Sequence, residues 1–75
     1  MFNELERVAL TVDLPAYNLR TGDMGTVVDV TSDGEEFTIE FLTLDGETFA
    51  VVPVTLSQIR RVGRFDITNA RPISA

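Results

Sequence analysis

Three aspartates around a glycine turn are the residues of this chain best suited to chemistry. Asp13 precedes a long loop, and Asp23 and Asp29 flank the turn formed by Gly22 and Gly25. Carboxylates at such a turn could ligate a metal or serve as a general acid and base. Aspartate beside glycine is also ordinary turn chemistry, because its side chain accepts hydrogen bonds from nearby main-chain N–H groups. We favour the second interpretation and predict no metal site.

Two further acidic stretches invite a comparison with calcium loops. One begins at Asp33-Gly34 and the other at Asp45-Gly46. Neither continues with the ligand spacing that a calcium loop requires, so both are interpreted as turns that carry solubilising charge.

The chain lacks most of the side chains that nucleophilic catalysis requires. The sequence contains no cysteine, histidine or lysine, so Ser32, Ser57 and Ser74 lack the usual activating bases. A chain this small also rarely encloses a substrate cavity. We therefore expect a non-catalytic protein without a cofactor.

The basic residues are unevenly distributed. Residues 1–59 hold two arginines and eleven acids, whereas residues 60–75 hold four arginines and one acid. The cluster Arg60, Arg61 and Arg64 precedes the alternating pair Phe65 and Ile67. One hypothesis is that this end docks on the acidic body of another copy or on a partner, by adding a strand to an open sheet edge. The alternative is that these arginines bridge to acids of their own domain.

Tyr17, the only tyrosine, lies near the tip of the long loop. Peptide-binding barrels use aromatic-lined grooves at such loops, which makes Tyr17 a candidate binding residue. That mode needs several exposed aromatic residues, and packing of Tyr17 over the barrel end is the favoured alternative.

These residues must be positioned by short β-strands. Alternation is clearest at Phe37, Ile39 and Phe41, which we expect to point into the core. Asp45-Gly46 is typical of a hairpin turn. The strand after this turn is expected to end before Pro53, because proline cannot donate a main-chain hydrogen bond. The expected strands cover residues 8–12, 25–30, 36–42, 47–52 and 60–62, with one short helical turn at 56–59.

The order of these elements indicates an all-β fold. We predict a small five-stranded SH3-like barrel over residues 1–62, with one short helical turn before the last core strand. An OB-like barrel is the alternative, although it usually needs a longer chain and a true helix. Residues 63–75 form a C-terminal tail that could supply an added strand.

The segment Gly22-Asp23-Met24-Gly25-Thr26-Val27-Val28, with Phe37-Thr38-Ile39-Glu40-Phe41 and Asp45-Gly46 after it, carries a resemblance to a known family. The chain resembles the bacterial family called domain of unknown function 4926 over roughly residues 2–62. This resemblance implies a small SH3-like barrel and brings no catalytic or binding residues. Residues 22–30 more weakly resemble the KOW motif of ribosomal and elongation proteins, whose members are usually rich in lysine and arginine around the motif.

These observations give a first expectation of function and two alternatives. We expect a protein-interaction module that could self-associate through its basic end. The alternatives are a KOW-like nucleic-acid binder, disfavoured by the net charge of −6, and an acidic inhibitor of a basic toxin or nuclease. The acidic N-terminus and the lack of a long apolar run favour the cytoplasm and no membrane association.

Overall fold

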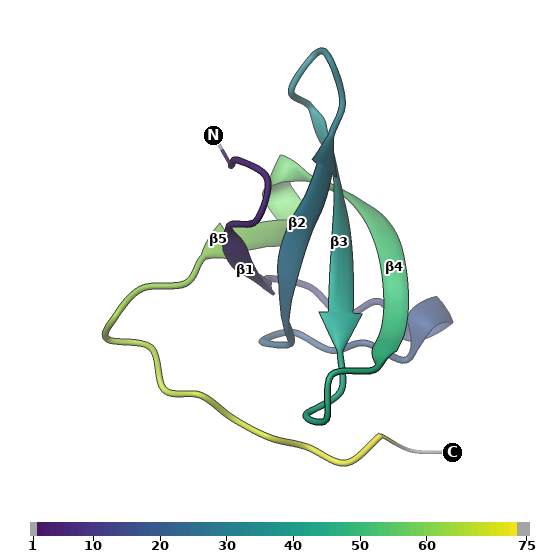
Figure 1. Ribbon diagram of the computed structural model, residues 1–75, viewed down its shortest axis with the longest axis vertical. Helices are drawn as coiled ribbons and strands as arrows, with labels where there is room; N and C mark the ends of the chain where they lie inside the picture. Colours follow the sequence, from purple (N-terminus) through teal and green to yellow (C-terminus); the bar gives the residue numbers. More distant parts are fainter. Residues whose placement is uncertain (1, 74–75) are drawn as a thin grey trace.

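The computed structural model describes residues 2–73, which form one antiparallel β-sheet with two short 3₁₀ turns (Figure 1). Its elements are β1 (Arg7–Leu10), η1 (Pro15–Tyr17), β2 (Met24–Val30), β3 (Glu36–Leu42), β4 (Thr48–Thr55), η2 (Leu56–Gln58) and β5 (Ile59–Arg61). The strand order is β4-β3-β2-β1-β5, so each strand pairs with its chain neighbour except β5, which returns to β1. The predicted all-β fold of five strands with a helical turn before the last is confirmed.

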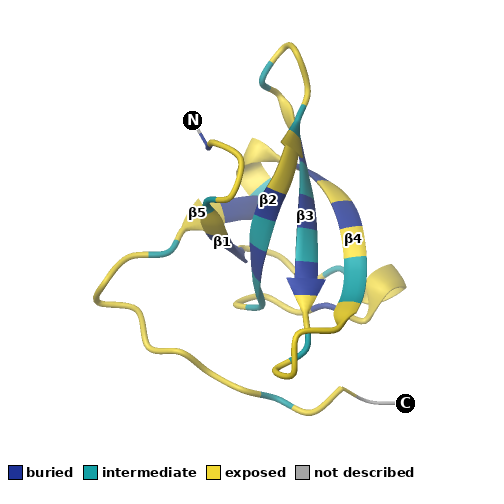
Figure 2. Ribbon diagram, in the orientation of Figure 1, coloured by how far each residue is buried: buried dark blue, intermediate teal, exposed yellow. Residues whose placement is uncertain are grey.

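Alternation along the strands builds the core. Phe37, Ile39 and Phe41 are all buried, as the period-two pattern predicted, and Figure 2 shows buried and more exposed residues alternating along β3. Phe2 lies edge-to-face against Phe37 with 5.7 Å between the ring centres. The buried apolar cluster consists of Phe2, Val8, Leu10, Leu19, Val27, Phe37, Ile39, Phe41, Val52, Val54 and Ile59.

Pro53 does not end the fourth strand, so that expectation was wrong. It lies within β4 and is paired with Thr38 of β3. Proline lacks an N–H group and is therefore tolerated in a sheet chiefly on an edge strand. β4 is such an edge, because β3 is its only neighbour in the sheet.

The two glycines of the turn before β2 have different physical roles. Gly22 has φ of 93°, the left-handed conformation expected for a reversal. Gly25 lies in β2, as the strand expected over residues 25–30 predicted, but it does not share the left-handed conformation expected for the turn. It is buried within β2, where a Cβ atom would lie 2.5 Å from Ile39 Cγ2 and 2.9 Å from the carbonyl oxygen of Glu40. Gly25 is therefore required by the close approach of β2 to β3.

Residues 63–73, hereafter the tail, contain no strand. An added strand in the chain's own sheet, considered from the alternation of Phe65 and Ile67, is thus not formed among the described residues. The tail instead leaves β5, swings away from the sheet and runs beneath the ends where β2 and β4 begin and β3 finishes (Figure 1). This course places the tail across one open end of the folded domain.

Candidate functional site

The aspartates at the turns bind main-chain and hydroxyl groups. Asp13 Oδ1 accepts hydrogen bonds from the N–H and hydroxyl groups of Thr21, at 2.8 and 3.0 Å. These two bonds lower the pKa of Asp13. Asp33 accepts from Thr31 Oγ1, and Asp45 accepts from Thr43 Oγ1 in the equivalent place of the next hairpin. Gly34 and Gly46 both have positive φ in these turns. The turn interpretation of the acidic stretches at Asp33 and Asp45 is therefore confirmed.

The predicted arginine cluster is not a single patch. Arg60 pairs with Asp66 at 3.1 Å, whereas Arg61 pairs with Glu6 and stacks over the Phe2 ring at 5.1 Å. Arg64 lies 4.7 Å from the centre of the neighbouring Phe65 ring. Two of the three arginines thus bridge to acids of their own chain, which was the alternative interpretation.

The remaining predicted residues are exposed at separate places. Phe65 and Ile67 of the tail are 86% and 91% exposed, and Tyr17 on η1 is 44% exposed. None of these three lines the groove described below. Nothing in their placement joins them to one another, so a binding role for them stays a prediction.

The site that sequence reasoning missed is a groove of about 690 Å³ between the tail and the open end of the sheet, hereafter the tail groove. Its wall on the sheet side is mainly apolar, formed by Leu19, Met24, Phe41, Leu42, Leu44 and Phe49. Its tail side is formed by Thr68, Asn69, Ala70, Arg71 and Ile73. Leu44, at the β3–β4 hairpin, is fully exposed.

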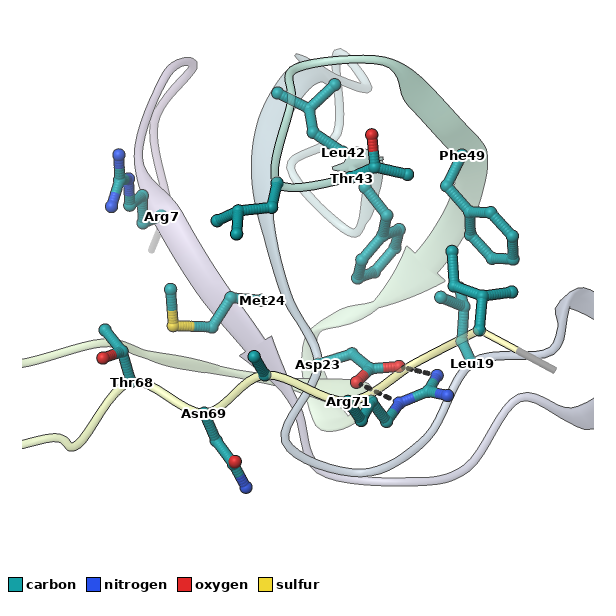
Figure 3. A pocket seen from close by; sticks show the side chains of 14 residues that line it. Arg7, Leu19, Asp23, Met24, Leu42, Thr43, Phe49, Thr68, Asn69 and Arg71 are labelled. Carbon is teal, nitrogen blue, oxygen red and sulfur yellow. Dashed lines mark hydrogen bonds and ion pairs between the residues drawn. The ribbon is translucent and has the colours of Figure 1, made fainter.

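One ion pair closes this groove. Arg71 donates from Nε to Asp23 Oδ1 at 2.9 Å and from Nη2 to Asp23 Oδ2 at 2.6 Å. Nη2 also donates to the main-chain oxygen of Asn18 at 3.1 Å. Figure 3 shows the two side chains facing each other, with Met24 on one side and Leu19 and Phe49 on the other. Paired bonds of this kind are among the strongest that arginine makes.

The position of Asp23 explains its readiness to accept a guanidinium group. Its side chain is 20% exposed, and Oδ2 also accepts the N–H of Arg20 at 2.8 Å, which fixes the carboxylate at the turn before β2. Burial raises the pKa of Asp23, but the bonds from Arg71 and Arg20 outweigh it, and the pKa lies below its ordinary value. The carboxylate is therefore ionised and rigidly placed at neutral pH.

We predict that Arg71→Ala raises the pKa of Asp23, since burial is then opposed only by the main-chain bond from Arg20 and by the positive charge of Arg20. In the wild type the pKa is lower in the folded than in the unfolded state. The contact with Arg71 thus contributes fully to stability above the ordinary aspartate pKa and is lost as the pH falls through the folded value. A carboxyl-carbon NMR titration of both proteins checks this, and an unchanged Asp23 pKa would show that the pair does not form.

Sequence reasoning assigned Asp23 to the turn and gave Arg71 no role. The two residues are 48 positions apart in the sequence, and no local pattern links them. The one available signal was that Arg71 stands among uncharged residues, immediately before Pro72 and Ile73.

Among residues 2–73, no group of histidine, cysteine, aspartate or glutamate side chains is placed to hold a metal ion. Within the same residues, no helix is long and apolar enough to cross a membrane.

The fold and the site define a small all-β domain, a single antiparallel sheet with an apolar groove at one end. Residues 4–61 match the model of a domain of unknown function, DUF4926, and the chain belongs to this family. The resemblance inferred from the Gly22–Val28 segment is thus confirmed, while the likeness to SH3-like and KOW-type barrels stays a prediction. Neither a search of curated proteins nor a search of solved structures finds a match.

The match has a consequence for the tail groove. The sheet-side wall lies wholly inside the matched residues, whereas the tail that covers it lies outside them. The family match therefore covers the sheet side of the groove and does not extend to its tail side.

Proposed function

We propose that this chain is a non-catalytic protein-interaction module and that the tail groove is its binding surface. The observation that carries the proposal is the set of accessible apolar side chains at the open end of the sheet, Met24, Leu42, Leu44 and Phe49, which the tail spans without filling the space between. The buried core residues Leu19 and Phe41 line the same groove. Concave apolar surfaces with a few fixed polar groups are typical of recognition sites. Asp23 supplies such a group at a defined position.

The distribution of charge supports a protein partner over a nucleic acid. Residues 1–59 are strongly acidic, and Asp23, at the centre of the KOW-like turn, places a carboxylate where a nucleic-acid binder would need positive charge. An acidic surface instead favours association with a partner that presents basic groups. The proposal keeps the cytoplasm as the location and includes no enzymatic activity.

The experiment uses the tagged full chain to capture proteins from a host lysate, with and without nuclease. Leu44→Asp places a charge at the rim of the groove on a fully exposed residue, so the fold is not disturbed. Leu56→Asp is the matched control, because Leu56 is 53% exposed on η2, outside the groove. We expect a nuclease-resistant partner that is retained by wild type and Leu56→Asp and lost with Leu44→Asp.

Two outcomes would contradict the proposal. Equal capture by Leu44→Asp and wild type would place binding outside the groove. Recovery of nucleic acid, or of proteins that disappear on nuclease treatment, would favour the KOW-like alternative.

A further inference from the structure

Asp66 ties the start of the tail to β5 through Arg60, and the part of the tail that lines the groove is held chiefly through one residue, Arg71. Within residues 63–73 only Arg71 is half-buried, and the other residues are exposed. The one main-chain hydrogen bond described for the tail stays within it, from the Asp66 N–H to the Gly63 carbonyl at 3.0 Å. The tail therefore resembles a docked extended peptide rather than an element of the sheet.

The contact with Arg71 has the form of a recognition site for a guanidinium group. Asp23 meets two nitrogens in a paired arrangement, and the Asn18 carbonyl accepts a further bond from one of them. A lysine ammonium group cannot reproduce this paired geometry, because its donors all lie on a single nitrogen. The paired geometry therefore favours an arginine over a lysine at this position.

The residues around Arg71 define what else a ligand must offer. Ala70 and Ile73 line the same groove as Leu19 and Phe49, and Ile73 is still 43% exposed. Pro72 lies between Arg71 and Ile73 and restricts Arg71 to extended backbone. A competing segment would thus present an arginine, followed two residues later by an apolar side chain, from an extended chain.

We propose that the tail is a built-in competitor, and that Asp23 and the tail groove bind an arginine-bearing extended segment of another protein, which displaces Arg71. This inference rests on the proposed function and deepens it by naming the chemistry of the partner. A tethered segment acts at an effective concentration on the order of millimolar, so it holds the groove closed against weak ligands and yields only to a better one.

The test uses a synthetic peptide with the sequence of residues 64–73. Calorimetry measures the dissociation constant of this peptide from the full chain. In the Arg71→Ala protein the internal competitor is removed while Asp23 is kept. In wild type the tail occupies the groove in most molecules, so only a fraction of them can bind the peptide, and the apparent affinity is weaker by that fraction. We therefore expect Arg71→Ala to bind the peptide about tenfold more tightly than wild type. Arg64→Ala, which alters another arginine of the tail away from the groove, is the matched control and should behave as wild type.

Two changes should abolish binding of the peptide to the Arg71→Ala protein. A peptide in which the residue equivalent to Arg71 is alanine requires no protein variant and should not bind. The double variant Arg71→Ala/Asp23→Asn keeps a side-chain oxygen for the Arg20 N–H and should also lose binding.

The inference would be overturned if wild type and Arg71→Ala bound the peptide with equal affinity. It would also be overturned if the peptide bound equally well with alanine in place of its arginine. A wild-type dimer that becomes a monomer on Arg71→Ala would overturn it as well, because Arg71 would then serve a second copy of the chain. These failures are distinguishable from failure of the proposed function. If Leu44→Asp abolishes capture of a partner while Asp23→Asn does not, the groove binds a protein but Asp23 does not recognise an arginine of that protein.

Discussion

Replacing Phe37 by alanine is expected to cost about 3–5 kcal/mol, the largest loss of folding free energy among the substitutions considered. Phe37 is 1% exposed, pairs edge-to-face with Phe2 and belongs to the buried cluster. Truncating a buried phenylalanine typically costs about 3–5 kcal/mol. A domain of 75 residues has a total stability of roughly 4–11 kcal/mol, so this single truncation removes at least about a quarter of it.

Phe65→Ala is the matched control for this prediction, since Phe65 is 86% exposed in the tail. Its free energy of unfolding should stay within about 0.5 kcal/mol of wild type. Urea unfolding followed by far-ultraviolet circular dichroism measures both variants. Comparable losses for the two phenylalanines would mean that the tail packs more deeply than described.

Replacing Gly25 by alanine should have the second largest effect, although it adds only one methyl group. The new Cβ would lie 2.5 Å from Ile39 Cγ2, 2.9 Å from the Glu40 carbonyl oxygen and 3.1 Å from Phe41 Cδ1. Because the Glu40 oxygen belongs to the main chain of the adjacent strand, the two strands must separate to admit it. We expect a loss of about 3 kcal/mol, the upper part of the usual range for overpacking.

Gly22→Ala separates this packing effect from backbone strain. Gly22 has φ of 93° and no atom within 4 Å of a Cβ built there, so the change should cost only the left-handed conformation, about 1–2 kcal/mol. The same unfolding experiment compares the two variants. A smaller loss for Gly25→Ala than for Gly22→Ala would contradict the described approach of β2 to β3.

The sheet could be predicted because its signals are local. Alternation of large apolar residues identified Phe37, Ile39 and Phe41 as core, and Asp-Gly pairs located both hairpins. Each signal depends on residues within a few positions of one another, which is the range over which side-chain periodicity and turn chemistry act. Pro53 was misjudged because its tolerance depends on β4 lying at the edge of the sheet, a property of the topology.

The candidate site could not be predicted in the same way. Asp23 and Arg71 meet only because the tail runs beneath the sheet, a path that no spacing in the sequence encodes. The basic cluster drew attention to Arg60 and Arg61, yet these two arginines form ion pairs with Asp66 and Glu6 of the same chain. Charge counting revealed an excess of arginine at the C-terminal end without revealing which arginine closes a groove.

The same geometry bears on how the chain would associate with a partner. Strand addition was the mechanism first favoured, but β5 has only three residues and Pro53 removes a main-chain donor from β4. The tail groove offers a different mode, in which side chains at the open end of the sheet receive an extended segment.

The measurement that most directly tests this account is an amide NMR titration of the 64–73 peptide into isotope-labelled Arg71→Ala protein. We predict that the shifted amides cluster around the tail groove, at residues 18–24, 41–44 and 49, and that Val51–Thr55 of β4 and Ile59–Arg61 of β5 stay unchanged. Shifts concentrated along Val51–Thr55 or Ile59–Arg61 would show strand addition at an edge. That result would contradict the tail groove as the binding surface.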